Sequence, residues 1–162
     1  LDLAGKQMAT LEEELDFVES YVDVERKTIG DDFEYSLTLG DGIDRKALGE
    51  FMIPSMTVQI LVENSIKHAL RGKAGKKLLH ITVRRDGCGG MTVTVGDNGN
   101  GFDIRRTAST GQGLDILRTT ISVLNQRNKR KTSLTVRNVY DTNGKTCGCE
   151  ASISFPQGLR EI

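Results

Sequence analysis

The residues best suited to chemistry lie in one short stretch, Pro54 to Leu70, whose apolar residues have helical spacing. At ~100° per residue, Asn64, Lys67 and His68 share one face of this predicted helix. An amide oxygen can hold a cation, an ammonium group can bind phosphate, and a neutral imidazole can line a flat ligand or a sugar. The stretch is therefore a candidate binding helix. Its opposite arc is apolar and is expected to pack on a core: Val58, Leu61, Val62, Ile66 and Ala69.

The same polar face has a simpler interpretation, in which it is only solvated. Glu63 and Lys67 are one turn apart and could form an ion pair worth about 0.2–0.5 kcal/mol. Ile60 lies within the polar arc, one turn before Asn64. A carboxylate there could orient a water molecule or deprotonate a nucleophile, whereas an isoleucine cannot. For this helix alone, both interpretations stay open.

Two glycine-rich segments follow, at Asp97–Asp103 and Ser109–Asp115. The first comes directly after a predicted strand, so its Asp97 could be a fixed acceptor beside a backbone that a ligand can approach closely. The sequence Asp-Asn-Gly is also ordinary turn chemistry. The second leads into a predicted helix, whose free N–H groups would suit a phosphate. The Gly-Lys-Ser/Thr of a P-loop is absent, so neither segment is decisive alone.

The pattern of apolar residues and turn residues predicts the elements that must position these groups. Thr10 can cap the first helix with Glu13 as its capping-box partner, and Gly30 ends it. A polar connector, 40–49, precedes the helix at 54–70, and the Gly/Ser/Thr-rich stretch 98–112 is expected to be a loop of functional length. The remaining expected elements are helices at 11–29 and 113–125 and strands at 33–39, 78–85, 91–97, 133–140 and 147–155.

The order of these elements predicts an α+β fold. Turn residues at 86–90 and 141–144 join strands into hairpins, and the helices are long enough to cover one face of a sheet. We expect a two-layer α/β sandwich with a mixed, mostly antiparallel sheet covered on one face by helices. His80 is expected at a surface or edge position.

The amino-acid composition excludes several classes of function. The 162 residues include 27% charged and 37% hydrophobic residues, as in a soluble globular domain. Lys and Arg number 22 and so do Asp and Glu, which gives no electrostatic reason to expect a nucleic-acid or anionic-membrane surface. Three cysteines favour a reducing compartment, and two histidines exclude a multi-His metal site. We expect a cytoplasmic domain taken from a longer chain.

In this order, the three segments resemble the GHKL (Bergerat) ATP-binding fold, and within it the catalytic domain of sensor histidine kinases of the LytS/YesM type. The stretch 61–69 resembles the N box, 97–101 the first glycine box and 110–114 the second. The acidic run 11–17 and the Ile53-Pro54 pair also fit that family. The resemblance covers about residues 10 to 157.

The resemblance implies a role for each matching residue, with ATP and Mg²⁺ as cofactors. Asn64 would hold the Mg²⁺ that bridges the phosphates, Lys67 would bind phosphate and His68 would line the nucleotide. Glu63 could serve as a base toward the phosphoacceptor, although a simple partnership with Lys67 is favoured. Asp97 would accept the adenine amino group.

The glycine boxes would complete this nucleotide site. Gly99 and Gly101 would let the base lie against the chain. The second box would wrap phosphate, and 102–112 would form a mobile lid. The residues of the second box are Thr110, Gly111, Gly113 and Leu114.

Four residues depart from the family pattern. Ser109 replaces a frequent Gly, and Ile116 replaces a frequent Asn. Cys149 replaces a Thr or Ser that usually supports the adenine-binding Asp; its alternation with Ala151, Ile153 and Phe155 favours a buried core thiol over a metal or redox role. Ile60 replaces the Glu of hydrolytic GHKL ATPases and argues against gyrase-like or MutL-like hydrolysis.

The implied function is transfer of the ATP γ-phosphoryl group to a His outside this fragment. We expect residues 1–30 to form a linker helix continuing from a dimerisation and phosphoacceptor segment, and 31–162 to form the ATP-binding domain. Implied partners are the acceptor segment of the same or a sister chain and a response regulator, in a homodimeric, inner-membrane-anchored parent protein. The alternatives are a degenerate nucleotide-binding module that acts through protein contacts, and a hydrolytic ATPase.

Overall fold

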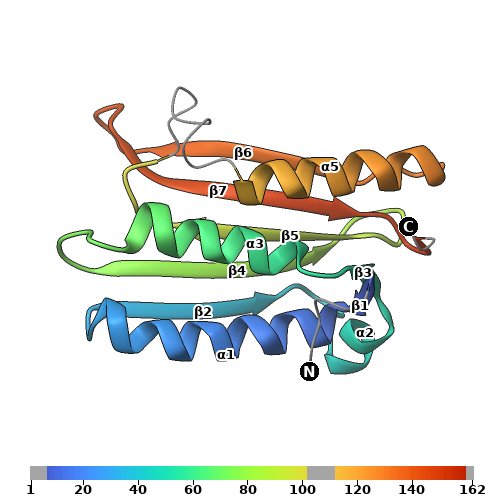
Figure 1. The fold of residues 1–162 in the computed structure, drawn as a ribbon, viewed down its shortest axis with the longest axis horizontal. Coiled ribbons are helices and arrows are strands. Elements are labelled where there is room, and N and C mark those ends of the chain that lie inside the picture. The colour runs from blue at the N-terminus through green and yellow to red at the C-terminus, as the bar shows by residue number, and fades with distance from the viewer. Residues whose placement is uncertain (1–6, 102–111, 160–162) are drawn as a thin grey trace.

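A computed structural model, which describes residues 7–101 and 112–159, shows a mixed sheet of five strands. Its strand order is β2-β4-β5-β7-β6 (Figure 1). β2 and β4 run parallel, and the other neighbouring pairs are antiparallel. The predicted α+β class and mostly antiparallel sheet are confirmed. The strands are β2 (Phe33–Leu39), β4 (Lys77–Arg85), β5 (Met91–Asp97), β6 (Ser133–Tyr140) and β7 (Thr146–Phe155).

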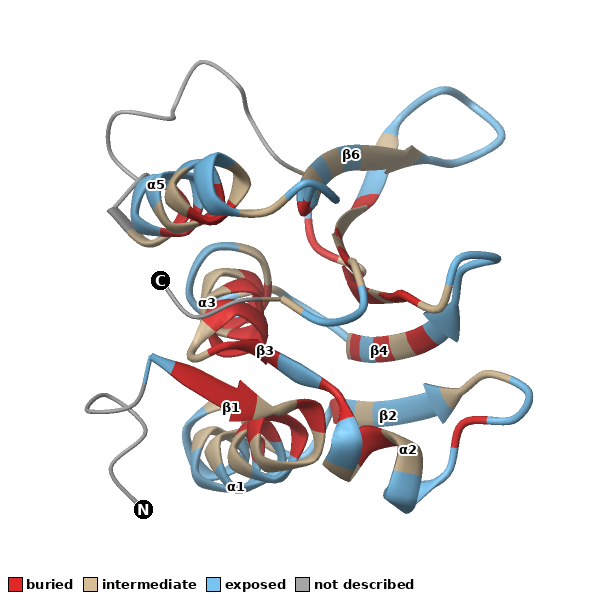
Figure 2. Ribbon diagram, turned by 90° about the vertical axis from the view of Figure 1, so that its right-hand side faces the viewer, coloured by how far each residue is buried: buried red, intermediate tan, exposed pale blue. Residues whose placement is uncertain are grey.

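Three helices cover one face of this sheet: α1 (Leu11–Ile29), α3 (Thr57–Asn64) and α5 (Gln112–Arg127) (Figure 1). The core lies between the helices and the sheet, as the buried residues on their facing sides show (Figure 2). Four residues of the predicted apolar arc of the central helix are buried, and the fifth, Ala69, is partly buried. Val58, Leu61, Val62 and Ile66 are each at most 2% exposed. Within the described part of the chain, no helix has the length and hydropathy required to traverse a bilayer.

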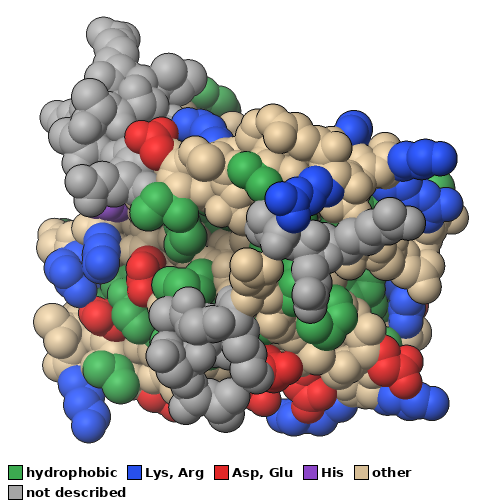
Figure 3. All heavy atoms as spheres, turned by 45° about the vertical axis from the view of Figure 1, so that its right-hand side comes forward, with side chains coloured by type: hydrophobic (Ala, Val, Ile, Leu, Met, Phe, Trp, Pro, Cys, Tyr) green, Lys and Arg blue, Asp and Glu red, His purple; other side chains and the backbone are tan. Residues whose placement is uncertain are grey.

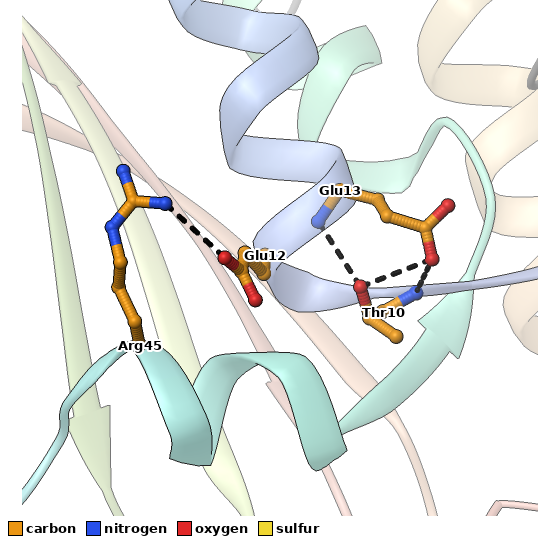
Figure 4. Close-up of polar contacts among 4 residues, drawn as sticks. All are labelled: Thr10, Glu12, Glu13 and Arg45. Atoms are coloured by element: carbon orange, nitrogen blue, oxygen red, sulfur yellow. Dashed lines mark hydrogen bonds and ion pairs between the residues drawn. The ribbon is translucent and has the colours of Figure 1, made fainter. Parts of the chain in front are cut away.

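The predicted first helix and its capping box are confirmed. Thr10 Oγ1 accepts the backbone N–H of Glu13 at 3.1 Å, and the Glu13 carboxylate accepts the N–H of Thr10 at 3.4 Å (Figure 4). Gly30 ends the helix with its N–H donated to the carbonyl of Arg26. Arg45 reaches Glu12 at 3.2 Å and joins α1 to the next short helix (Figure 4).

The predicted polar connector at 40–49 is wrong in part, because it includes the helix α2 (Arg45–Glu50). Asp44 caps α2 by accepting the N–H of Ala47 at 2.8 Å, and Leu48 is buried. Its two apolar residues, Ala47 and Leu48, are adjacent and give no helical periodicity, so the pattern could not reveal this helix.

The start of the central helix also differs from the prediction. Pro54 is not in its first turn but ends β3 (Met52–Pro54), which pairs antiparallel with β1 (Met8–Thr10). α3 begins at Thr57, after Met56 turns the backbone with a φ of 70°. Three-residue strands are too short to show alternation in a sequence.

A buried carboxylate from α1 caps α3. Glu14 is fully buried, and its two oxygens accept the N–H groups of Met56, Val58 and Gln59 at 3.2, 3.1 and 3.4 Å. Free N–H groups at a helix start attract negative charge. Burial raises the pKa of Glu14, while these three hydrogen bonds oppose the rise. Glu14 thus fixes the start of α3 to α1.

The predicted helix does not stay α-helical to Leu70. From Ser65 to Leu70 it widens into the π-helix η2, and Arg71 donates its N–H to the carbonyl of Ile66, five residues back, at 2.8 Å. π-Helical turns are rare and are frequent at functional sites. The widening changes which side chains share a face after Asn64.

Charge is unevenly distributed on the surface. Most of the acidic side chains visible in Figure 3 lie along its lower edge, on the side where Figure 1 places α1 and α2, with basic side chains among them, whereas the charged side chains at the upper right are basic. The sequence shows the same unevenness. α1 has three acids in its first turn, whereas every charged residue in 116–140 is Lys or Arg. The net charge of zero therefore hides an uneven distribution.

Candidate functional site

A cavity of about 490 Å³ lies where η2, the end of β5, the start of α5 and the strands β6 and β7 meet. Four of the polar side chains named from the sequence line it: Asn64, Lys67, His68 and Asp97. Gly101 and Leu114 line it as well. Residues from three separate segments of the sequence are thus brought together.

Asn64 is the last residue of α3, and it has unused hydrogen-bonding capacity. Its Nδ2 atom is buried and has no hydrogen-bond partner among the described residues. Gly113, at the start of α5, approaches so closely that a Cβ there would lie 3.3 Å from Asn64 Oδ1. A buried amide without a partner is costly unless a ligand or water satisfies it. The atom without a partner is a hydrogen-bond donor, so it fits a phosphate oxygen or a water molecule as its acceptor.

Lys67 and His68 follow on η2, and both are exposed where they border the cavity. Glu63 does not line the cavity; it accepts a hydrogen bond from Gln59 Nε2 at 2.9 Å. Among the described residues no ion pair joins Glu63 to Lys67, so the solvated pair considered from the sequence is not formed. Lys67 therefore remains available to an anionic ligand.

Asp97 ends β5 with only 8% of its surface exposed. Burial raises the pKa of its carboxyl group. Hydrogen bonds from the Gly99 N–H (3.0 Å to Oδ1), the Ser65 side chain and the Cys149 backbone oppose the rise, as does the charge of His80. The carboxyl group is thus held at the cavity wall as an acceptor for a ligand donor.

The first glycine box is held closely against its surroundings. Asn98 accepts the N–H of Leu78 at 2.8 Å and donates to the Lys76 carbonyl at 2.9 Å, which fixes the turn to β4. A Cβ on Gly99 would meet Ala69 of η2 at 2.5 Å, so only glycine fits there. Gly101 has a φ of 86°, which glycine adopts readily. These contacts bring the turn against the helix that carries Asn64.

The second box is only partly described. Gly113 belongs to α5 and contacts Asn64, and Leu114 is buried at the cavity. The described residues do not include 102–111 of the expected lid, the range that contains Ser109, Thr110 and Gly111. The predicted helix after this box is confirmed, and it extends to Arg127.

The expectation of a core thiol at Cys149 is wrong. Cys149 is a free cysteine of intermediate exposure that pairs with Asp97 in register and lines the cavity, whereas Ile153 and Phe155 of the same strand are in the core. Burial, with the charges of Asp97 and Glu150, raises the pKa of the thiol to about 12.

Several residues at the site were not singled out from the sequence. They are Ser65, Asn100, Val136 and Ala151. Ser65 follows Asn64 directly, and Ala151 alternates with Cys149, so these two could have been found from the predicted elements. His80 is exposed, as expected, but it lies on β4, an interior strand of the sheet. Ile60 packs partly against the core, and Ile116 is 59% exposed.

Comparison with solved structures identifies the class of fold. The mycobacterial sensor histidine kinase MprB matches with a TM-score of 0.61 over 94% of this chain and 99% of that chain, at 16% identity. Full-length ShkA in complex with AMPPNP matches with a TM-score of 0.65 over 99% of this chain and 34% of that one, at 14% identity. The fold is that of histidine kinase catalytic domains.

Sequence relatives narrow this class further. The sensor protein LytS of Staphylococcus saprophyticus is 34% identical over 99 residues, which are 61% of this chain and 16% of that protein. The sensor histidine kinase YesM of Bacillus subtilis is 32% identical over 106 residues, or 65% of this chain and 17% of that protein. No family model matches the chain. The resemblance to catalytic domains of LytS/YesM-type sensor kinases is confirmed, and this chain spans about one sixth of their length.

Proposed function

We propose that this domain binds Mg-ATP in the described cavity and, as the catalytic domain of a histidine kinase, transfers the γ-phosphoryl group to a His on a segment outside these residues. The observation that carries the proposal is the meeting of Asn64, Lys67, His68 and Asp97 around one cavity. The neighbour solved with AMPPNP supports a nucleotide as the ligand.

At the inner end of the cavity, Asp97 would select the base. Its carboxylate accepts a hydrogen bond, so it favours a ring with an exocyclic amino group and disfavours one with a carbonyl at the same place. Leu61, Val136 and Ala151 give the cavity an apolar wall against which a flat ring could lie. Adenine combines an apolar ring surface with the required donor.

At the outer end, the exposed Lys67 would pair with phosphate oxygens, and Asn64 would place its amide oxygen toward the cation. Mg²⁺ takes few protein ligands and keeps waters and phosphates as its others, which fits a single amide. When bound, the ion would neutralise charge that develops on the phosphates. The N–H groups at the start of α5, near Gly113, would add a further anion site.

Phosphoryl transfer is mostly a matter of positioning and electrostatic stabilisation, so it needs no strong base in the cavity. Glu63 is held by Gln59 outside the cavity, and a role for it as a base would need a changed side-chain position. Ile60 offers no group that could activate water. We therefore expect the isolated domain to release phosphate from ATP only slowly, unlike a hydrolytic ATPase.

The parent protein would supply the partners. We propose an acceptor His on a dimerising segment of the same or a sister chain, and a response regulator as the next acceptor. We also propose that the domain works in the cytoplasm, in a homodimer anchored to the inner membrane through segments outside this chain.

The first experiment is a calorimetric titration with Mg-ATP. We expect Asp97→Asn and Asn64→Asp to weaken binding at least tenfold, because each changes a group that touches the ligand. Asp41→Asn and Asn143→Asp change exposed turn residues and serve as matched controls. Unchanged affinity in the two cavity variants would refute the site.

The second experiment tests the reaction. A longer chain that includes the acceptor segment is incubated with γ-labelled ATP, and the phosphoprotein is treated with acid. An acid-labile, base-stable label supports transfer to histidine. Absence of binding at millimolar Mg-ATP would instead favour the degenerate module that acts through protein contacts.

A further inference from the structure

Arg71 ends the π-helical turn that carries two of the cavity residues. Its backbone N–H donates to the carbonyl of Ile66, five residues back, at 2.8 Å. Its side chain leaves η2 and donates from Nη2 to Glu25 Oε2 on α1, also at 2.8 Å. α1 packs beside the central helix (Figure 1). One residue therefore completes the wide turn and ties it to the neighbouring helix.

The wide turn determines which side chains face the cavity. A π-turn hydrogen-bonds five residues back instead of four, so each residue advances the helix by less than the ~100° of an α-helix, and residues four apart come nearly into line. Asn64 and His68, four apart, both line the cavity. Ile66 and Leu70, also four apart, are both 0% exposed. Lys67 is exposed at the cavity border.

The ion pair that holds this turn is partly withdrawn from water. The Glu25 side chain is 16% exposed and that of Arg71 is 45% exposed. The pair of Arg45 with Glu12, also on α1, is more exposed, at 77% and 32%. A charge-assisted hydrogen bond is stronger where fewer waters compete. Loss of the Arg71 side chain would leave the Glu25 carboxylate without this partner.

We propose that Arg71 is a positioning residue, which ties the end of η2 to Glu25 and so holds Lys67 within reach of the nucleotide phosphates. This inference rests on the proposed function and extends it to a residue that does not line the cavity. Without the tie, the end of η2 would shift relative to α1. The apparent affinity would then fall with the fraction of molecules whose Lys67 stays in place.

Glu25→Gln separates positioning from simple electrostatics. The change removes a negative charge, so electrostatic attraction alone would strengthen the binding of anionic Mg-ATP. We expect it instead to weaken Mg-ATP binding about fivefold in calorimetry, the upper end of what an ion pair near the surface contributes. Arg71→Gln should weaken binding to a similar extent. Combining the two changes should add little, because the pair is already broken.

Adenosine, which has no phosphates, tests whether the effect passes through Lys67. Titration followed by NMR should show the same adenosine affinity for the native chain, Glu25→Gln and Arg71→Gln. In a Lys67→Ala background, Arg71→Gln should cause no further loss of Mg-ATP affinity. A general packing defect would weaken adenosine binding as well and would add to the effect of Lys67→Ala.

Two further variants serve as controls. Arg45→Gln removes another arginine that pairs with α1, at a residue that does not line the cavity, and should leave Mg-ATP affinity unchanged. Arg71→Lys keeps a cation toward Glu25 and should retain more of the affinity than Arg71→Gln. Thermal unfolding of each variant reports whether it is folded.

The results separate the two proposals. If the native chain does not bind Mg-ATP, the proposed function fails. If the native chain binds, but Glu25→Gln binds equally well or more tightly, the proposed function stands and the positioning role of Arg71 is wrong. Equal weakening of Mg-ATP and adenosine would also overturn the positioning role.

Discussion

At the scale of single residues, two buried carboxylates serve different purposes. Glu14 and Asp97 are at most 8% exposed, and burial raises the pKa of each. Glu14 uses its two oxygens on three backbone N–H groups at the start of α3. Asp97 accepts the N–H of Gly99 at Oδ1, and its side chain lies at the wall of the cavity. The first is committed to structure and the second remains available to a ligand.

The raised pKa of Glu14 predicts a specific pH dependence of stability. Folding raises the pKa of Glu14 from its unfolded value of 4.5. Such a carboxyl group adds to the free energy of unfolding below pH 4.5, and this contribution is lost as the pH rises through the folded pKa. Glu14→Gln removes this titration and misplaces an amide N–H₂ against the helix start. We expect the variant to be about 1–3 kcal/mol less stable at pH 7.

Urea unfolding between pH 7 and pH 5 measures the effect. The stability difference between the native chain and Glu14→Gln should increase as the pH falls, because only the native chain gains from protonating Glu14. Asp97 contributes in the same sense to both proteins and cancels. Asp16→Asn, an exposed acid on the same helix, is the control, and a constant difference for Glu14→Gln would contradict the argument.

Most of the candidate site residues could be named from the sequence, because their types recur in a recognisable order. Asn64, Lys67, His68 and Asp97 all line the cavity. Glu63 shares their predicted face but lies outside the cavity, since Gln59 holds it and the helix widens beyond Asn64. Ser65 follows Asn64 and could have been found from the predicted helix, whereas the position of Cys149 at the cavity depends on the pairing of β7 with β5.

At the scale of elements, the close contact between the first glycine box and η2 determines the cavity. The turn at Gly99 lies against Ala69, and Asn98 fixes the same turn to β4. Small residues on both sides permit this approach. The contact is therefore expected to be sensitive to a single methyl group.

Gly99→Ala tests this contact. The added Cβ would meet Ala69 at 2.5 Å and must displace the turn or the helix. We expect a loss of about 1–3 kcal/mol in unfolding free energy, typical of overpacking, together with weaker Mg-ATP binding. Gly87→Ala is a matched control in the β4–β5 turn, where a Cβ would meet nothing within 4 Å. Equal stability of the two variants would show that the contact can relax.

The elements that sequence analysis predicted well are those whose signals are local. The strand Met91–Asp97 and the capping box of Thr10 and Glu13 depend on neighbours a few residues away. The β1–β3 pair, by contrast, joins Met8 to Pro54. Within η2, Ala69 lies against Gly99, which is distant in the sequence, and α2 packs Leu48 and the neighbouring Ala47 on the core. Such features are set by tertiary contacts that periodicity does not record.

At the scale of the whole molecule, the sheet combines local and distant pairings. β4–β5 and β6–β7 are hairpins, whereas β2 pairs with β4 in a register that places Phe33 opposite Lys77. Loop closure costs entropy before distant contacts form. We therefore expect the two hairpins to form early and β2, with α1 beside it, to join the sheet late.

Two partly buried leucines make this order measurable. Leu134→Ala in β6 should mainly slow folding, and Leu39→Ala in β2 should mainly speed unfolding, because contacts absent from the transition state affect the unfolding rate. Stopped-flow folding and unfolding in urea give both rates for each variant. The reverse assignment, with Leu39→Ala slowing folding, would contradict the proposed order.

The acidic first turn of α1 and the basic segment 116–140 have a consequence for handling the protein. The isoelectric point is about 6.9, so near neutral pH no net repulsion keeps copies apart. The acidic first turn of α1 in one copy can then attract the basic segment 116–140 of another, and dissolved salt screens that attraction over ~10 Å at 0.1 M. The domain should therefore dissolve better in moderate salt than in dilute buffer at neutral pH, which is salting-in driven by a molecular dipole.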